Sequence, residues 1–226
     1  CAGVQPVAHL GQQRGVGPDA LAFACRKRLR HRDGFYKAHD RDQKCGHRQL
    51  FDQGQIKAGE KVLVTGIGGG VAQFAAQFAL ALGAEVFVSS SSQEKSNKAM
   101  GLGVSGAFNY KTENWTHEAL EKTGGFDLMI DGAAGDSLNN LITVAKPGAR
   151  IVFYGATMGN PGKIEARRIF WNQLKIMGST MGSDQDFKEM LDLVSTKKIR
   201  PVLDQMFPLQ NAVEAFDRMK AGAQFG

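Results

Sequence analysis

The stretch KVLVTGIGGGVAQFAAQFALALGA, residues 61–84, decides the fold of this chain. Its first five residues, KVLVT, form an apolar run with the length of one buried parallel strand. Four glycines follow, at positions 66, 68, 69 and 70. Apolar residues then recur at the 3.6-residue period of an amphipathic helix over residues 71–82, and Gly83 ends this pattern. The stretch therefore predicts a strand, a tight glycine turn and a helix, in that order.

A glycine turn between a strand and a helix is typical of a site for a dinucleotide pyrophosphate. Glycines let the backbone approach the phosphates closely. The first amides of the helix have no partner inside the helix, so they point toward the anion at the positive end of the helix dipole. We therefore expect Gly68, Gly69 and Gly70 to contact a pyrophosphate. The alternative is a flexible turn without a ligand, which the strand and helix around the glycines make the weaker interpretation.

The end of the second predicted strand, Glu85 to Ser89, bears on the choice of cofactor. A domain that prefers NAD usually carries Asp or Glu at this point, to accept hydrogen bonds from the ribose hydroxyls. This sequence has a run of serines instead, and Ser90, Ser91 and Lys95 offer donors for a 2′-phosphate. We therefore expect NADP(H). The alternative is that the serines cap a helix over residues 92–101 and that Lys95 is solvated, and one run of serines can serve both roles.

The rest of the chain alternates strands and helices. We expect strands at residues 107–110, 126–131, 150–154 and 174–178, and helices at 112–122, 137–145, 165–172, 185–196 and 210–220. This alternation predicts an α/β fold, a doubly wound and mainly parallel sheet with helices on both faces. Small-residue loops follow two of the strands, at residues 132–135 and 155–157, where such sheets bind their ligands.

The first 49 residues differ in composition from the remainder. They carry 10 Lys and Arg against 4 Asp, whereas residues 50–226 carry 18 residues of each charge. The net charge of +6 therefore does not indicate a nucleic-acid partner for the main domain. The basic run RKRLRHRD, residues 26–33, also lacks the interleaved aromatic residues on which the bases of a single-stranded nucleic acid would stack. We expect an irregular, poorly ordered basic segment over residues 1–49, or a displaced reading frame, joined to one domain over residues 50–226.

Several other function classes find little support in the sequence. Metal binding is disfavoured because no pair in the set Cys25, His31, His39, Cys45 and His47 has C-x-x-C spacing. A thiolate nucleophile at either of the two cysteines is disfavoured as well. His117 lies in a polar helix, so we expect it to be solvated, and no residue in 50–226 stands out as a catalytic acid or nucleophile. No apolar run reaches transmembrane length and no signal-peptide layout begins the chain, so we expect a cytoplasmic protein without a membrane partner.

From about Leu50 to Gly226 the chain resembles the cofactor domain of the medium-chain dehydrogenase/reductase superfamily. It is most similar to the quinone oxidoreductase and zinc-type alcohol dehydrogenase-like branch. The resemblance covers nearly four-fifths of the chain and rests on these stretches, in the family's order: GQIKAGEKVLVTGIGGGVAQFAAQFA, SSSSQEK, FNYKTENW, FDLMIDGAAG, KPGARIVFYGAT, LKIMGSTMGS, KKIRPVLDQMFPL and AGAQFG. One departure is Ala72, which stands where the family's glycine turn usually has its last glycine.

The resemblance implies a contact for each part of the cofactor. It implies pyrophosphate contact at Gly69, Gly70 and Val71, and adenosine-phosphate contact at Ser90, Lys95 and Tyr110. Nicotinamide or ribose contact is implied at Gly132, Ala133, Gly155, Ala156, Thr157 and Phe225. For Tyr110 the alternative role of an aromatic at the edge of the core carries equal weight.

The resemblance also implies an activity, namely NADPH-dependent hydride transfer to a quinone, an activated alkene or a carbonyl. In that family a separate catalytic domain precedes the cofactor domain, and residues 1–49 are too short to be that domain and do not resemble it. We therefore expect a cofactor-binding domain whose catalytic domain is missing from this chain, with a small-molecule substrate and a homodimer as the assembly to test. The main alternative is a non-catalytic module that senses NADP(H). A methyltransferase is disfavoured because it would require an acidic residue at the end of the second strand, where this chain has Ser90. A nucleotide hydrolase with a phosphate-binding loop is disfavoured because no Gly-Lys-Ser/Thr follows the glycines.

Overall fold

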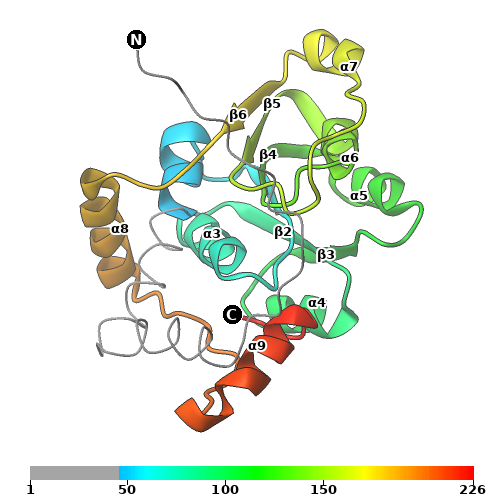
Figure 1. The fold of residues 1–226 in the computed structure, drawn as a ribbon. Coiled ribbons are helices and arrows are strands. Elements are labelled where there is room, and N and C mark those ends of the chain that lie inside the picture. Colours follow the sequence, from blue (N-terminus) through cyan, green and yellow to red (C-terminus); the bar gives the residue numbers. More distant parts are fainter. Residues whose placement is uncertain (1–45) are drawn as a thin grey trace, which may run out of the picture. The chain divides into compact units, whose positions relative to one another are not determined.

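The computed structural model describes residues 46–226, whose strands form one six-stranded sheet (Figure 1). Every neighbouring pair of strands is parallel, and their order is β3-β2-β1-β4-β5-β6. The strands are β1 (Lys61–Val64), β2 (Glu85–Ser90), β3 (Gly106–Asn109), β4 (Phe126–Asp131), β5 (Ala145–Phe153) and β6 (Lys175–Gly178). Because all strands run the same way, their carboxyl ends lie along one edge of the sheet.

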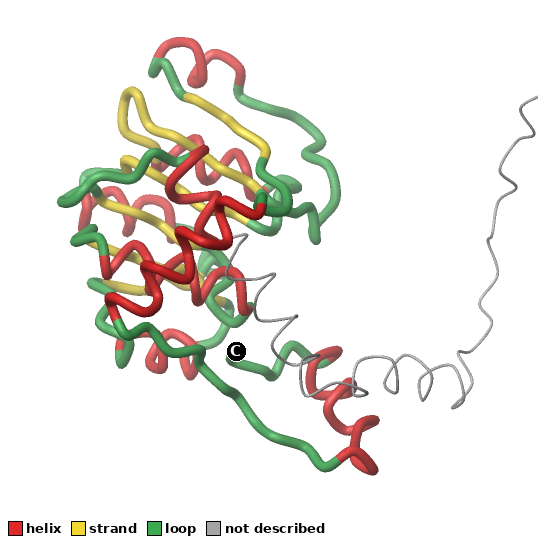
Figure 2. The backbone as a smooth tube through the Cα atoms, turned by 90° about the vertical axis from the view of Figure 1, so that its left-hand side faces the viewer, coloured by secondary structure: helices red, strands yellow, loops and turns green. Residues whose placement is uncertain are grey.

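Helices cover both faces of the sheet, and Figure 2 shows the strands stacked edge to edge with helices around them. The helical elements are η1 (Gln49–Gln53), α3 (Gly70–Ala81), α4 (Gln93–Met100), α5 (Trp115–Thr123), α6 (Ser137–Val144), α7 (Ala166–Trp171), α8 (Asp184–Lys197), η2 (Leu209–Asn211) and α9 (Ala212–Lys220). The predicted doubly wound α/β class is confirmed. Predicted and observed ends agree within three residues, except that β5 begins five residues early, through the turn at 145–149, with a shift in its pairing to β4.

The side chains of β1 show how the two cores arise. Val62 and Val64 point into a core shared with α3 and α4, whereas Leu63 points into a second core shared with α5 and α6. All three side chains are fully buried. A central parallel strand must be apolar on both faces, which is why this segment reads as a continuous apolar run and not as an alternating one.

The strand order reverses between β1 and β4. Strands β2 and β3 lie on one side of β1, whereas β4, β5 and β6 follow on the other side. The chain after β1 therefore packs on one face of the sheet, in α3, and the chain after β4 packs on the other face, in α6. Ligands of open α/β sheets bind at this point of reversal.

The ordered domain extends a few residues further toward the N-terminus than expected. Residues 46–53 are helical and include η1, and His47, Gln49 and Leu50 are buried. The irregular segment expected over residues 1–49 is therefore wrong for residues 46–49. Their sequence, GHRQ, carries no apolar period. Contacts with other elements hold them: Gly46 lies against α3, and His47 stacks on Phe51 and lies 3.9 Å from Asp186 of α8. The remainder of that segment lies outside the described residues. Within residues 46–226, no helix combines the length and the apolarity needed to cross a membrane.

Asp127 connects the N-terminal ends of β1 and β4 through hydrogen bonds of its side chain. Its carboxylate accepts hydrogen bonds from the Lys61 amide and from Lys146 Nζ, each at 2.8 Å. Burial alone would raise the pKa of Asp127, but these two bonds outweigh it and hold the pKa below the usual value of 3.8. A carboxylate with a lowered pKa stabilises the fold at neutral pH and loses that contribution as the pH falls through its folded pKa.

We therefore expect Asp127→Asn to lower the free energy of unfolding by about 1 kcal/mol at pH 7, the typical net value of such a hydrogen bond. The difference between wild type and variant should shrink below pH 4. Urea denaturation at pH 7, 5 and 3 measures it, and a difference that stays constant over this range would contradict the prediction.

Candidate cofactor-binding site

The glycine turn leaves β1 and folds back on itself before α3 begins. Gly66 adopts a left-handed conformation with φ of 64°, which glycine tolerates without strain. The amide of Ile67 donates to the Ser89 carbonyl at 3.2 Å, and that of Gly69 donates to the Gly66 carbonyl at 3.1 Å. These bonds tie the turn to β2 and bring the start of α3 to the carboxyl end of the sheet.

The N-terminus of α3 fits an anion. Gly69 is the N-cap residue, no side chain caps the helix, and the first turn contains no acidic residue. The first helical amide with an acceptor is that of Gln73, which donates to the Gly69 carbonyl at 3.0 Å. The preceding amides, of Gly70, Val71 and Ala72, have no acceptor within the helix. The expected site residues Gly68, Gly69, Gly70 and Val71 therefore lie together at an uncapped helix start.

Lys95 lies directly over this turn. A Cβ atom at Gly68 would come within 2.7 Å of Lys95 Nζ, so the ammonium group occupies the space that a side chain at position 68 would need. The ammonium group donates a 2.6 Å hydrogen bond to the Gly222 carbonyl. Burial lowers the pKa of Lys95, opposed in part by the Asp204 carboxylate. Lys95 is thus partly buried beside the expected phosphate position and is not the solvated side chain of the alternative interpretation.

The serine run has a structural role as well. Ser92 caps α4, because its hydroxyl accepts from the Lys95 amide, and the Ser90 hydroxyl accepts from the Ser92 amide at 3.1 Å. Ser90 is buried and Ser91 is exposed. The amide of Tyr110 donates to the Ser90 carbonyl at 3.3 Å and its side chain is 46% exposed, so the residue lies at the rim beside the serines. Because Ser92 is the residue that caps α4, the exposed Ser91 is not needed for capping.

The loops after β4 and β5 are bonded to each other. The Tyr154 amide donates to the Asp131 carbonyl at 2.9 Å, the Met158 amide to the Ala133 carbonyl at 2.9 Å, and the Thr157 hydroxyl to the Gly132 carbonyl at 3.3 Å. The close approach requires glycine, since a Cβ atom at Gly155 would lie 2.8 Å from the Gly132 carbonyl oxygen. The expected residues Gly132, Ala133, Gly155, Ala156 and Thr157 therefore form one continuous patch.

Asp131 anchors this patch and was missed in the sequence analysis. Its carboxylate is buried and accepts hydrogen bonds from the Thr65 hydroxyl at 2.5 Å and from the Ala134 amide at 2.7 Å. It therefore joins the ends of β1 and β4, at the point where the strand order reverses. The sequence signal was an acidic residue directly after the apolar run LMI of the strand FDLMID, a position where burial is unusual unless the carboxylate has partners.

We expect Asp131→Ala to lower the free energy of unfolding by about 2–4 kcal/mol, because the variant loses two hydrogen bonds to a carboxylate and leaves the Ala134 amide buried without an acceptor. Thermal and urea unfolding measure the loss. The control is Glu113→Ala, at an exposed position before α5, which should change stability by less than about 0.5 kcal/mol.

Two further aromatic residues lie near the site. Phe225 is buried in the core that contains α3 and α4, and Lys98 Nζ lies 5.7 Å from its ring centre. The contact of Phe225 with nicotinamide or ribose stays a prediction. The sequence did not predict a place for Tyr154 in the site, because this residue was assigned to the end of the strand at 150–154. A Cβ atom at Gly132 would lie 2.7 Å from the Tyr154 hydroxyl, so this phenol lies against the Gly132 backbone.

Of the histidines and cysteines that the sequence analysis weighed together, only His47 is described. Its Nδ1 lies 3.9 Å from Asp186, its ring stacks on Phe51 at 4.2 Å, and burial lowers its pKa. Cys25, His31, His39, Cys45 and the basic run at 26–33 lie outside the described residues. His117 is exposed, as expected, 3.5 Å from Glu121. Among residues 46–226, no three His, Cys, Asp or Glu side chains cluster as a metal site would require.

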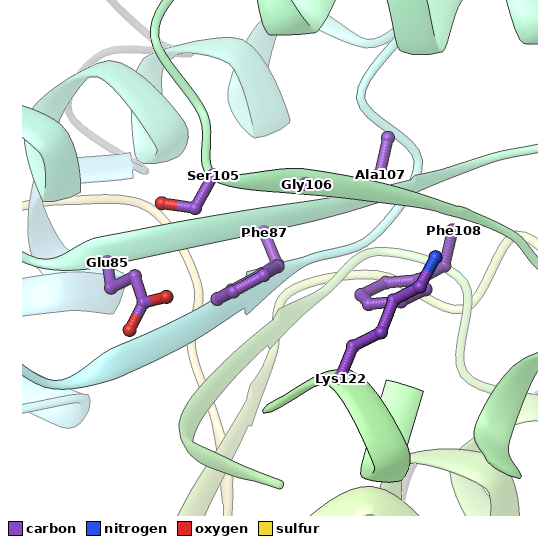
Figure 3. Close-up of a pocket in the computed structure, with 7 residues that line it drawn as sticks. All are labelled: Glu85, Phe87, Ser105, Gly106, Ala107, Phe108 and Lys122. Atoms are coloured by element: carbon purple, nitrogen blue, oxygen red, sulfur yellow. The ribbon is translucent and has the colours of Figure 1, made fainter. Parts of the chain in front are cut away.

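A cavity of about 290 Å³ lies beside β2, β3 and α5 (Figure 3). It is lined by Glu85, Phe87, Ser105, Gly106, Ala107, Phe108 and Lys122. Phe87 and Phe108 belong to the core shared with α5 and α6, whereas the glycine turn leads into α3 on the opposite face of the sheet. The cavity is therefore separate from the start of α3.

Comparison with known proteins identifies the family. The model of the zinc-binding dehydrogenase family matches residues 70–196, which is more than half of the chain. The chain belongs to this family. The match begins at the start of α3 and runs through the end of the sheet into α8, so the described fold is the cofactor-binding domain of a medium-chain oxidoreductase.

Individual relatives agree with this assignment. The chain is 39% identical over 186 residues to a zinc-type alcohol dehydrogenase-like protein, YogA, of Leptosphaeria maculans, covering 76% of this chain and 51% of that protein. It is 27% identical to a quinone oxidoreductase of Mus musculus, covering 78% and 56%. Among solved structures, an NAD-dependent alcohol dehydrogenase superposes with a TM-score of 0.76 at 30% identity, covering 82% of this chain and 55% of that one. The chain thus spans about half the length of the relatives that it matches.

Proposed function

We propose that residues 50–226 bind NADP(H) as the cofactor domain of an oxidoreductase that transfers hydride to a quinone, an activated alkene or a carbonyl compound. The observation that carries the proposal is the uncapped start of α3, which lies at the carboxyl end of the sheet where the strand order reverses. A pyrophosphate placed there would accept hydrogen bonds from the amides of Gly70 and Val71, which have no acceptor within the helix. The related quinone oxidoreductase supports the choice of substrate class.

The preference for the phosphorylated cofactor rests on the end of β2. No carboxylate stands there to accept hydrogen bonds from a ribose or to repel a 2′-phosphate. The exposed hydroxyl of Ser91, the hydroxyl of Ser90 and the ammonium of Lys95 are donors for such a group. A solved relative at 30% identity is described as NAD-dependent, so the two cofactors have to be compared directly.

When bound, the nicotinamide would supply hydride from its C4 atom. The residues of this chain would hold and orient the cofactor. The α3 amides would bind its pyrophosphate, and the joined loops after β4 and β5 would form the surface under its nicotinamide end. Asp131 would keep these loops at a fixed separation from β1 through its bonds to Thr65 and Ala134. The substrate pocket and any proton donor belong to the parts of the relatives that this chain does not match.

The test is calorimetric titration of the full chain with NADPH and NADH side by side, followed by assays of NADPH oxidation with quinone, enone and aldehyde acceptors. Tighter binding of NADPH together with acceptor-dependent oxidation supports the proposal in full. Binding without oxidation by any acceptor favours the NADP(H)-sensing module. Absence of binding by either cofactor contradicts both interpretations.

We also propose that the chain forms a homodimer, with the outer edge of β6 as the surface to examine first. β6 ends the sheet, and its outer edge has no strand partner among residues 46–226. Phe170 and Trp171 in the adjoining α7 are 67% and 79% exposed. An apolar strand edge of this kind can pair with a symmetry-related copy. Light scattering would give the mass in solution.

A further inference from the structure

The last five residues, Gly222 to Gly226, form a segment that is fastened to the glycine turn. The Gly226 amide donates to the Gly68 carbonyl at 3.3 Å, and the Gly222 carbonyl accepts from Lys95 Nζ at 2.6 Å. Phe225 between them is buried in the core that contains α3 and α4. Two main-chain groups and one side chain of this segment therefore contact the elements that form the expected phosphate site.

Asp204 connects the segment to α9. Its carboxylate accepts two hydrogen bonds from Arg218 in α9, at 2.5 and 2.9 Å. The backbone amide of Phe225 also faces this carboxylate and helps to lower its pKa. The hydrogen bonds from Arg218 hold the pKa of Asp204 below its usual value, so the group is charged at neutral pH. Figure 2 shows α9 at the end of a long loop away from the sheet, so these few bonds and Phe225 connect it to the domain.

The Lys95 ammonium group links the segment to the turn. It has three N–H donors, and one of them is bonded to Gly222. The remaining donors lie over Gly68, beside the helix start that would hold a phosphate. One ammonium group can therefore bond a phosphate oxygen and the Gly222 carbonyl at the same time. A phosphate placed there would also offset the desolvation of this partly buried cation.

We propose that Lys95 bridges a cofactor phosphate to the Gly222 carbonyl, so that cofactor binding and docking of the segment Gly222–Gly226 strengthen each other. This inference rests on the proposed function of the site. Coupling of this kind is reciprocal: the factor by which docking of the segment raises cofactor affinity equals the factor by which cofactor binding favours docking. Lys95 then contacts the cofactor directly, whereas Asp204 is a positioning residue, because it acts through the segment and need not touch the cofactor.

The variant Asp204→Ala gives the deciding experiment, because its two effects should change NADPH affinity in opposite directions. By charge alone, removing a carboxylate near Lys95 should strengthen the binding of an anionic cofactor. Through the coupling, loss of the carboxylate that bonds Arg218 and faces the Phe225 amide should loosen the segment and weaken NADPH binding, by about 5- to 20-fold, within the usual range of coupling between sites. The matched control is Glu214→Ala, which removes the same charge from an exposed position in α9 and should leave affinity within about twofold.

A double-mutant cycle with Lys95→Met tests the bridge itself. The Asp204→Ala effect should largely disappear in the Lys95→Met background, since the link between phosphate and segment is already absent there. Additive effects, or tighter binding by Asp204→Ala, would overturn the inference. If Asp204→Ala does not fold, hydrogen exchange on the wild type decides: NADPH should slow exchange of the amides at 222–226, and unchanged or faster exchange contradicts the bridge.

The same measurements show which phosphate of the cofactor Lys95 contacts. They also distinguish a failure of the coupling from a failure of the proposed function. Slowing by both NADPH and NADH identifies the pyrophosphate as the group bridged by Lys95, whereas slowing by NADPH alone identifies the 2′-phosphate. If the wild type binds neither cofactor, the proposed function fails. If it binds NADPH but shows neither the weakening nor the slowed exchange, only the coupling fails.

Discussion

Gly69→Asp should weaken NADPH binding by at least about 100-fold while leaving the fold as stable as before or slightly more stable. Gly69 caps α3 with φ of −94° and ψ of 149°, a conformation that any residue adopts, and a Cβ atom there would lie 3.7 Å from its nearest neighbour. Asp is a favoured N-cap residue, so the helix should gain a few tenths of a kcal/mol. A pyrophosphate at the same amides would meet a like charge, and two charges about 4 Å apart repel by about 4 kcal/mol at an effective dielectric constant near 20.

Gly69→Asn is the matched control, since it keeps the shape and the capping oxygen but adds no charge. It should weaken binding far less than Gly69→Asp does. Calorimetric titration gives the affinities and thermal unfolding gives the stabilities. If both variants bound NADPH as tightly as the wild type, the pyrophosphate would not be held at the start of α3, and the proposed site would be wrong.

Ser90→Asp should reverse the preference for NADPH over NADH, lowering the ratio of their affinities by about 100-fold. A carboxylate at the end of β2 would repel a 2′-phosphate and accept hydrogen bonds from an unphosphorylated ribose. Ser90 is buried, so the variant should also lose about 1–3 kcal/mol of stability from burying a charged group. The measurement is the ratio of the two dissociation constants, which is insensitive to a uniform loss of stability.

Ser91→Asp separates charge from burial in this experiment. Ser91 is exposed, so its carboxylate remains solvated and should not destabilise the fold. The affinity ratio should move in the same direction as for Ser90→Asp, by a smaller factor. A ratio that changes in neither variant would remove the serines from the account of cofactor preference and leave Lys95 as the candidate for the phosphate contact.

The fold was predictable because its local patterns are consistent with one another. The apolar run at 61–65, the glycines after it and the helical period over 71–82 all require a strand followed by a turn and a helix, and the structure has β1 and α3 there. The serine run was equally informative about capping, since Ser92 does cap α4. By contrast, residues 46–53 carry no period of their own, and their helix depends on packing that a sequence pattern does not display.

The parts of the site that were missed depend on contacts between distant residues. The bond from Lys95 to Gly222 spans 127 positions, and the bond from Thr65 to Asp131 spans 66. Periodicity and turn chemistry describe neighbours along the chain, so they carry no information about such pairs. Gly68 illustrates the difference: its lack of a side chain suggested room for a phosphate, whereas the structure places the Lys95 ammonium group in that space.

The order of the strands has a consequence for how the chain acquires its structure. β1 pairs with β4, and the Lys61 amide bonds to Asp127, 66 positions later. The centre of the sheet therefore remains open on one side until the chain as far as β4 has left the ribosome, and such long-range pairing is slow and leaves a strand edge exposed to aggregation meanwhile. Nascent chains that end before Phe126 should depend on chaperones, whereas chains that include β4 and β5 should not.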